Sequence, residues 1–267
     1  MGNNRIIEAE GITYTYPDGT LAVENAYFYL ERGERVAIVG PNGSGKSTLL
    51  KILSALMEPQ EGSIKFYGKE NVKEKELRKK FGIILQNPDD MLFNATVMED
   101  LEFGPAQIGM KRNEFEKILE ELDEIFSLSP LLKKPPFKLS EGEKQRVAMA
   151  CALATKPEVL FLDEPFSALD VGMKRKVVEY LNKLNAEGMA MVTVSHELDI
   201  IPRVADRVYL LNRRVVAEGK VEDILSDDKI LTENGMEPLP VAKIAAALGM
   251  KDIPLTIEEF INALKSK

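Results

Sequence analysis

The segment Gly40–Thr48, which reads G-P-N-G-S-G-K-S-T, constrains the fold more than any other part of the chain. It follows the mostly apolar run Arg35–Val39 and precedes the apolar-rich run Leu49–Leu53. A buried strand, a glycine-rich turn and a helix start, in this order, are typical of a phosphate-binding loop. The glycines allow successive backbone N–H groups to point at a phosphate, and the helix start adds further free N–H groups. The segment therefore predicts a site for a nucleoside triphosphate.

The residues that close this loop have the side chains that such a site needs. Lys46 can reach the β and γ phosphates, and the Ser47 hydroxyl can ligate Mg²⁺. The other nucleotide-binding residues that we expect in the loop are Gly40, Asn42, Gly43, Ser44, Gly45 and Thr48.

Two carboxylates follow the apolar run Val159–Leu162, at Asp163 and Glu164. At the end of a strand beside the phosphates, Asp163 can hold Mg²⁺ through its water shell, and Glu164 can polarise the attacking water. On its own, an Asp-Glu pair after a strand is equally compatible with an ordinary surface turn.

Two more polar residues follow predicted strands. His196, the one histidine of the chain, follows Ala190–Val194, where its imidazole could meet the γ-phosphate and the water. Gln86 follows Phe81–Leu85 and offers an amide to Mg²⁺ or to the water. Taken singly, a structural histidine and a polar strand cap are the simpler interpretations.

The pattern along the chain predicts an α/β fold. Antiparallel strands are expected first, at Arg5–Glu10, Ile12–Tyr16, Ala22–Leu30 and Ser63–Tyr67. Short apolar runs separated by helices then predict a parallel sheet buried on both faces, with strands at Phe81–Leu85, Val159–Leu162, Ala190–Val194 and Arg207–Leu211. We place the first domain at residues 1–226, with a helical subdomain at about 89–155, and a helical tail at 227–267.

The composition excludes several classes of protein. A net charge of −8 disfavours a nucleic-acid surface. The longest apolar run, Val147–Ala154, is far shorter than the ~20 residues of a membrane span, and no charged-then-apolar leader precedes Ile6. We therefore expect an intracellular protein that neither binds nucleic acid nor inserts into a membrane itself.

A further segment, Leu139–Arg146, reads L-S-E-G-E-K-Q-R, in which Ser140 and Glu143 form a capping box at a helix start. With this segment the set of motifs resembles the nucleotide-binding subunit of ABC transporters, over roughly residues 5–225. The segment stands where that family has its signature L-S-G-G-Q-x-Q-R, and it departs from the commonest pattern at Glu141 and Glu143. The other matching positions are Gln86 in the Q-loop, Ser167–Asp170 in the D-loop, His196 as the switch histidine and Tyr16 as the aromatic residue that stacks on adenine.

The resemblance implies a P-loop NTPase core that binds ATP with Mg²⁺ and works as a dimer. In that family two subunits meet head to tail, and each ATP lies between one phosphate loop and the signature helix of the other subunit. Ser140 and Gly142 would then grip the γ-phosphate across the dimer, and hydrolysis would let the pair open. The chemistry is in-line attack of water on the γ-phosphorus. The partner can be a second copy or a related chain.

The segment Gln86–Phe93 narrows the resemblance further. It reads Q-N-P-D-D-M-L-F and is similar to the Q-N-P-D-D-Q-L-F stretch of the energy-coupling-factor ATPases, with Met91 in place of the usual Gln. Those proteins energise importers of vitamins and of cobalt or nickel, and their tails, which this chain resembles at 237–240 and 254–259, help to hold two ATPase subunits together. The resemblance implies integral-membrane partner subunits and a place at the cytoplasmic face of the membrane.

Three alternatives remain open at this point. One is the ATPase of an importer that is served by an extracellular binding protein. Another is a soluble ABC protein acting on ribosomes or DNA, although such chains normally carry two phosphate loops or a long coiled-coil insertion, and neither is present in this sequence. The third is an ATP sensor that does not hydrolyse, against which Glu164 and His196 weigh.

Overall fold

The computed structural model describes residues 4–265, and the outermost residues of the two predicted domains, 1–3 and 266–267, lie outside this range. The chain forms two compact units. Unit 1 consists of the residues up to Glu70 together with those from Thr193 onward, and unit 2 consists of Asn71–Val192. Each unit is described by itself.

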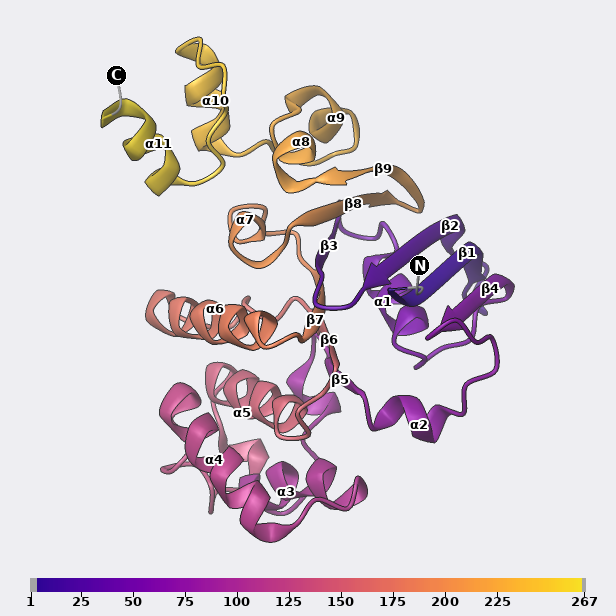
Figure 1. Ribbon diagram of the computed structural model, residues 1–267, viewed down its shortest axis with the longest axis vertical. Coiled ribbons are helices and arrows are strands. Elements are labelled where there is room, and N and C mark those ends of the chain that lie inside the picture. Colours follow the sequence, from indigo (N-terminus) through magenta and orange to yellow (C-terminus); the bar gives the residue numbers. More distant parts are fainter. Residues whose placement is uncertain (1–3, 266–267) are drawn as a thin grey trace. The chain divides into compact units, whose positions relative to one another are not determined.

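Unit 1 begins with an antiparallel sheet in the order β2-β1-β4, whose strands lie side by side in Figure 1. The strands are β1 (Arg5–Thr15), β2 (Leu21–Glu31) and β4 (Glu61–Phe66). The sequence predicted two strands where β1 is continuous, because the pattern breaks at Gly11. The chain passes through Gly11 with φ 67° and a shift of register. Gly62 packs closely against Gly11, and a Cβ on Gly62 would lie 2.5 Å from the Gly11 carbonyl oxygen.

The second group of strands in unit 1 carries the phosphate loop. Strand β3 (Arg35–Val39) runs parallel to β8 (Arg207–Asn212), and β8 is antiparallel to β9 (Arg214–Lys220). Four of the five residues of β3 are buried, as an apolar strand with both faces covered should be. Helix α1 (Lys46–Leu53) follows the loop. The sequence did not predict β9.

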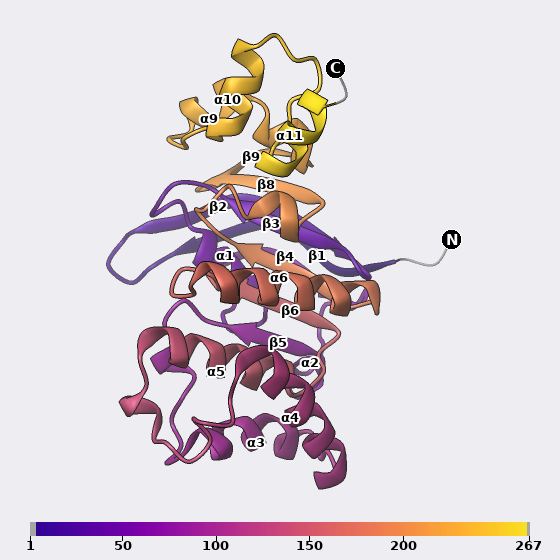
Figure 2. The same cartoon turned by 90° about the vertical axis from the view of Figure 1, so that its left-hand side faces the viewer.

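Unit 2 contains the parallel pair β5 (Phe81–Ile84) and β6 (Val159–Asp163). Between these strands the chain forms helices, as predicted: η1 (Pro88–Asp90), α3 (Val97–Gln107), α4 (Arg112–Phe126), η2 (Pro136–Lys138) and α5 (Glu141–Leu153). Helices α4 and α5 present buried apolar side chains to each other, and α6 (Val171–Ala186) packs on α4 (Figure 2). Helix α2 (Glu74–Arg78) precedes β5, and strand β7 (Ala190–Val194) follows α6 at the border of the two units.

The C-terminal part of unit 1 is helical, and its helices from residue 228 onward lie in the predicted tail. It contains α7 (Ile201–Val204), α8 (Val221–Leu225), α9 (Asp228–Glu233), α10 (Pro240–Ala247) and α11 (Ile257–Lys265). Residues Leu239, Ala242 and Ala245 are buried, whereas Ile244 and Leu248 are exposed. None of the helices within residues 4–265 combines the length and the apolar character required to cross a membrane. The predicted α/β class, with an antiparallel N-terminal sheet and a helical tail, is confirmed.

Candidate nucleotide-binding site

The phosphate loop is shaped by glycines at places where no side chain fits. A Cβ on Gly40 would lie 2.0 Å from the Leu211 carbonyl oxygen, and one on Gly45 would lie 2.1 Å from the Ala22 carbonyl oxygen. Gly45 has φ 94° and forms the N-cap of α1. The loop can therefore close tightly around the start of α1 only with glycine at these two positions.

Lys46 lies over the loop. Its Nζ donates hydrogen bonds to the carbonyl oxygens of Gly40 at 2.8 Å and of Pro41 at 2.9 Å, and the residue is 7% exposed. Its ammonium group thus stands at the mouth of the loop, beside backbone N–H groups at the start of α1. This concentration of positive charge and N–H donors suits a bound triphosphate.

The buried hydroxyl of Ser44 provides a test of whether a phosphate fits. Ser44 Oγ is buried and has no hydrogen-bond partner among the described residues. The space beside it exists because residue 40 lacks a Cβ, which would lie 2.8 Å from this hydroxyl. A buried hydroxyl without a partner is costly. A phosphate oxygen in the loop would supply one.

The aromatic residue predicted for adenine also lies at this loop. Tyr16 is half-buried, and its hydroxyl lies 2.9 Å from Thr48 Oγ1, in α1. Its ring meets that of Tyr14 edge to face, with the ring centroids 5.2 Å apart. Two contacts therefore fix the ring of Tyr16 beside the loop, where stacking on a base is possible.

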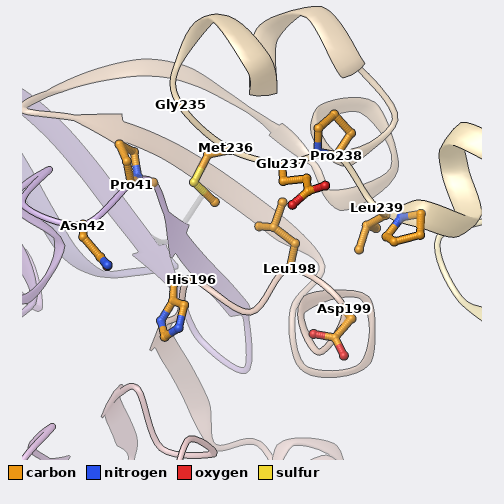
Figure 3. A pocket seen from close by; sticks show the side chains of 12 residues that line it. Pro41, Asn42, His196, Leu198, Asp199, Gly235, Met236, Glu237, Pro238 and Leu239 are labelled. Carbon is orange, nitrogen blue, oxygen red and sulfur yellow. The ribbon is translucent and has the colours of Figure 1, made fainter.

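His196 lies at the same place. The preceding residue, Ser195, donates its N–H to the Ile38 carbonyl of β3 at 3.4 Å, so the chain after β7 passes beside the strand that leads into the loop. His196 is exposed and lines a cleft of about 530 Å³ together with Gly40, Pro41 and Asn42. Figure 3 shows the side chains that line this cleft, with the imidazole of His196 next to the side chain of Asn42.

The opposite wall of this cleft was not predicted. It consists of tail residues Gly235–Pro240, together with Leu198 and Asp199 (Figure 3). Gly235 comes so close to the loop that a Cβ on it would lie 3.7 Å from the Pro41 ring. This position could not be predicted from the sequence, because the E-P-L-P motif at 237–240 contains no local signal for a contact with the phosphate loop.

Unit 2 brings together the residues predicted to act on Mg²⁺ and water. Strands β5 and β6 are parallel neighbours, with Ile84 opposite Leu162, so Gln86 and the pair Asp163 and Glu164 emerge at the same edge. Asp163 is 1% exposed and Glu164 is 7% exposed. Both carboxylates are therefore largely shielded from water.

The backbone around Glu164 is unusual. Glu164 has a backbone φ of 49°, in the left-handed region that residues other than glycine rarely adopt. Its carbonyl accepts a hydrogen bond from Ser167 Oγ at 3.2 Å, and the next residue, Pro165, accepts one from Gln145 Nε2 at 3.0 Å. Residues in such a conformation persist where their surroundings hold them, which is common at functional sites. The anchoring role of Gln145 was not predicted.

The predicted capping box at the start of α5 is confirmed. Ser140 Oγ accepts from the Glu143 N–H at 3.3 Å, and the Glu143 carboxylate accepts from the Ser140 N–H at 2.8 Å. The hydrogen bonds from the backbone and hydroxyl of Ser140 hold the pKa of Glu143 below its usual range. Ser140 and Gly142 line a hollow of about 260 Å³ beside Asp170. A Cβ on Gly142 would lie 3.0 Å from the Ala168 carbonyl oxygen, so a larger residue there would crowd this backbone.

The predicted metal ligands are of the right chemical type for Mg²⁺. Ser47, Gln86 and Asp163 offer hydroxyl, amide and carboxylate oxygens, which are hard ligands. No cluster of three or more His, Cys, Asp or Glu side chains within residues 4–265 forms a metal site by itself. The joining of these residues and the phosphate loop into one site stays a prediction.

Comparison with known proteins agrees with these features. Residues 23–167 match the family model described as ABC transporter. An ABC transporter ATP-binding protein of Archaeoglobus fulgidus is 41% identical over 88% of this chain and 100% of its own length. The energy-coupling factor transporter ATP-binding protein EcfA of Methanococcus maripaludis is 36% identical over 97% of both chains.

Solved structures give the same result. The cbiO1 protein of Clostridium perfringens, described as part of the ABC transporter complex cbiONQ, has a TM-score of 0.73 and 31% identity over 93% of this chain and all of its own. A dimeric ATP-binding cassette in a post-hydrolysis state, bound to ADP and Pi, has a TM-score of 0.73 and 30% identity over 80% of this chain and 98% of its own. The fold and the phosphate loop thus define an ATP-binding cassette with ATPase activity. The chain belongs to the ABC transporter family, as an ATP-binding subunit.

Proposed function

We propose that the chain is the ATP-hydrolysing subunit of an energy-coupling-factor importer, which takes up a metal ion or a vitamin through integral-membrane subunits. The EcfA name of relatives at 36% identity and the cbiONQ complex of a structural neighbour support this assignment. The observation that carries it within the chain is the Gln86–Phe93 segment, because its sequence distinguishes this group and its Phe93 side chain is 64% exposed. In this proposal the chain lies at the cytoplasmic face of the membrane and binds no nucleic acid.

The residues of the site have three roles: binding of the nucleotide, binding of Mg²⁺ and activation of the attacking water. The phosphate loop, with Lys46, Ser47 and Thr48, holds the triphosphate, and Tyr16 stacks on adenine. Ser47, Gln86 and Asp163 are the residues that would hold Mg²⁺, which neutralises phosphate charge when bound. Glu164 accepts a proton from the attacking water while His196 orients the water and the γ-phosphate. The new bond joins the water oxygen to the γ-phosphorus, the bond to the β–γ bridging oxygen breaks, and ADP and phosphate leave.

The second ATPase subunit, a second copy or a related chain, completes each site. Ser140 and Gly142 of one subunit would bind the γ-phosphate held by the loop of the other. The start of α5 suits this role because the backbone N–H groups at a helix N-terminus can donate hydrogen bonds to an anion. The pair closes on ATP and opens after hydrolysis, and this movement drives the membrane subunits.

Two variants test the catalytic roles. Glu164→Gln keeps the shape of the side chain but cannot accept the proton, so turnover should fall by about 10²- to 10⁴-fold. ATP should still bind, and the variant should accumulate as an ATP-bound dimer. Lys46→Ala should neither bind ATP tightly nor dimerise with it. ATPase rates and sedimentation measure both effects, with Glu187→Gln, an exposed carboxylate after α6, as the control. Near-normal hydrolysis by Glu164→Gln would remove this residue from the mechanism.

The same variants test the importer assignment. Tagged wild-type protein and Glu164→Gln should purify from detergent-solubilised membranes with integral-membrane proteins that mass spectrometry can identify. Recovery with ribosomal proteins or DNA, and without membrane proteins, would contradict the assignment.

A further inference from the structure

Lys144 joins two segments of unit 2 to which separate roles in ATP hydrolysis are assigned above. Its Nζ lies 2.8 Å from Asp89 Oδ1 and 3.0 Å from Asp89 Oδ2. The same Nζ lies 3.0 Å from Glu141 Oε1. The Lys144 side chain is only 11% exposed, whereas those of Asp89 and Glu141 are 54% and 67% exposed. One shielded ammonium therefore pairs with two carboxylates whose side chains are largely exposed to solvent.

One of these carboxylates belongs to the segment that carries Gln86. Asp89 lies in the short helix η1, where its own N–H donates to Asn87 Oδ1 at 3.2 Å. The turn is closed by a hydrogen bond from the Leu85 N–H to the Met91 sulfur at 3.3 Å. Only two residues separate Gln86 from Asp89, in a turn with its own internal hydrogen bonds, so a shift of Gln86 should be transmitted to Asp89.

The other end of the link is the start of α5. Glu141 is the first residue of the helix and directly follows Ser140, the N-cap. The backbone N–H of Lys144 donates to the Ser140 carbonyl at 2.8 Å. Lys144 thus contacts the Ser140 turn through its backbone and the Gln86 segment through its side chain.

We infer that Lys144 is a positioning residue that couples the two ATP sites of the dimer. The inference rests on the proposed function, in which Gln86 acts on the ATP of its own subunit and Ser140 acts on the ATP of the partner. A link between these two residues within one chain is then a link between two ATP sites. Glu141, which stands where the family usually has glycine, supplies a carboxylate to this link.

The experiment measures the ATP dependence of hydrolysis by the full-length protein and by Lys144→Met. The wild type should hydrolyse ATP cooperatively. Lys144→Met should lower the Hill coefficient toward 1 and reduce kcat by about 10- to 100-fold, because Gln86 and Ser140 are no longer held in one geometry. The affinity of a single subunit for ATP should change less than twofold, since the phosphate loop is untouched.

Three matched variants keep the result interpretable. Lys144→Arg restores a cation and should recover most of the cooperativity. Asp89→Asn removes the carboxylate that pairs with Lys144, and it should lower the Hill coefficient although Lys144 is unchanged. Lys183→Met, which breaks the exposed ion pair of Lys183 with Glu121, should leave both parameters unchanged.

Different failures have different meanings. A Glu164→Gln protein that forms no ATP-dependent dimer overturns the two-subunit site itself, and this inference with it. If that dimer forms, then a wild type without cooperativity, or a folded Lys144→Met with unchanged cooperativity, overturns the role of Lys144 alone. Equal losses in Lys144→Met and Lys144→Arg would also overturn it, because a coupling role requires only the cation.

Discussion

At the scale of single residues, Arg207 connects several parts of unit 1 through one side chain. Its guanidinium bonds both oxygens of Glu34, at 2.6 and 3.0 Å, and one oxygen of Glu218 at 2.5 Å. It also donates to the Tyr209 hydroxyl at 2.7 Å and lies 3.7 Å above the centre of the Tyr29 ring. Its side chain is 13% exposed. Arg207 therefore ties β2 and the turn after it to β8 and β9.

The burial of these partners predicts a large effect on stability. Arg207→Met leaves the partly buried Glu34 and Glu218 without their shared cation. Breaking a fully buried pair in this way costs about 3–5 kcal/mol, so we expect a loss toward the lower end of this range. Arg214→Met is the matched control, because Arg214 pairs with Glu24 where the two side chains are 64% and 36% exposed. Such an exposed pair contributes roughly 0–1 kcal/mol. Urea unfolding of both variants measures the difference, and equal losses would contradict the role of burial.

At the scale of elements, the Gln86–Phe103 segment presents an aromatic surface. Phe93 and Phe103 meet edge to face with centroids 5.0 Å apart and are 64% and 44% exposed. Asp100 Oδ1 accepts hydrogen bonds from the N–H groups of Phe93 and Asn94, at 3.1 and 3.0 Å. Leu92, directly before Phe93, is 8% exposed and packs into the core. A rigid backbone thus displays two aromatic rings.

We expect this aromatic surface to receive a helix of a membrane subunit. In a Cys151→Ala background, a cysteine at Phe93 should crosslink to an integral-membrane protein in membranes. A cysteine at Val216, which is 43% exposed in unit 1, is the control and should not. Crosslinks from position 93 that join only two ATPase subunits would assign this surface to the dimer instead.

Most elements could be predicted because their signals are local. The phosphate loop, the capping box of Ser140 and Glu143, and the apolar strands β3, β5 and β6 are each set by a few neighbouring residues. Helix α3 shows where local signals fail. The pair Gly104 and Pro105 would locally end a helix, yet α3 runs through Pro105 to Gln107. Its residues Val97, Leu101 and Pro105 are buried on one side, and this packing outweighs one lost hydrogen bond.

The other missed features depend on contacts between distant parts of the chain. Strand β9 has a Gly219 within it and is half-exposed, so its pairing with β8, rather than its own pattern, makes it a strand. The link from Lys144 to Asp89 spans 55 positions, and no spacing rule refers to it. The same holds for the tail wall of the cleft at His196.

At the scale of the whole molecule, the tail carries more apolar surface than its own packing uses. Ile244 and Leu248, one turn apart on α10, are 53% and 59% exposed. Ile257, Ile261 and Leu264 on the neighbouring α11 are 67%, 43% and 48% exposed (Figure 1). The apolar spacing of Val241, Ile244, Ala245 and Leu248 favours a buried stripe, but of these four only Ala245 is buried, together with the neighbouring Ala242. The exposed stripe suits a contact with a second subunit.

We expect this stripe to strengthen the dimer. Ile244→Ser with Leu248→Ser keeps the buried side of α10 and should weaken association by about 2–3 kcal/mol, or roughly 30- to 150-fold in Kd. Deletion of residues 237–267 should weaken it at least as much while each subunit stays folded. Sedimentation equilibrium measures both, with Val216→Ser as an exposed apolar control. An unchanged monomer–dimer balance would assign the tail another role.

The cleft at His196 has a consequence for selective inhibition. One wall is made of phosphate-loop residues, which a great many ATPases share in kind, and the other is made of Met236–Pro240. The tail wall lies outside residues 23–167, the part of the chain that the family model matches. A small molecule that fills the cleft must therefore contact both the phosphate loop and the tail. Such a compound would compete with the nucleotide at the loop and would take part of its selectivity from the tail.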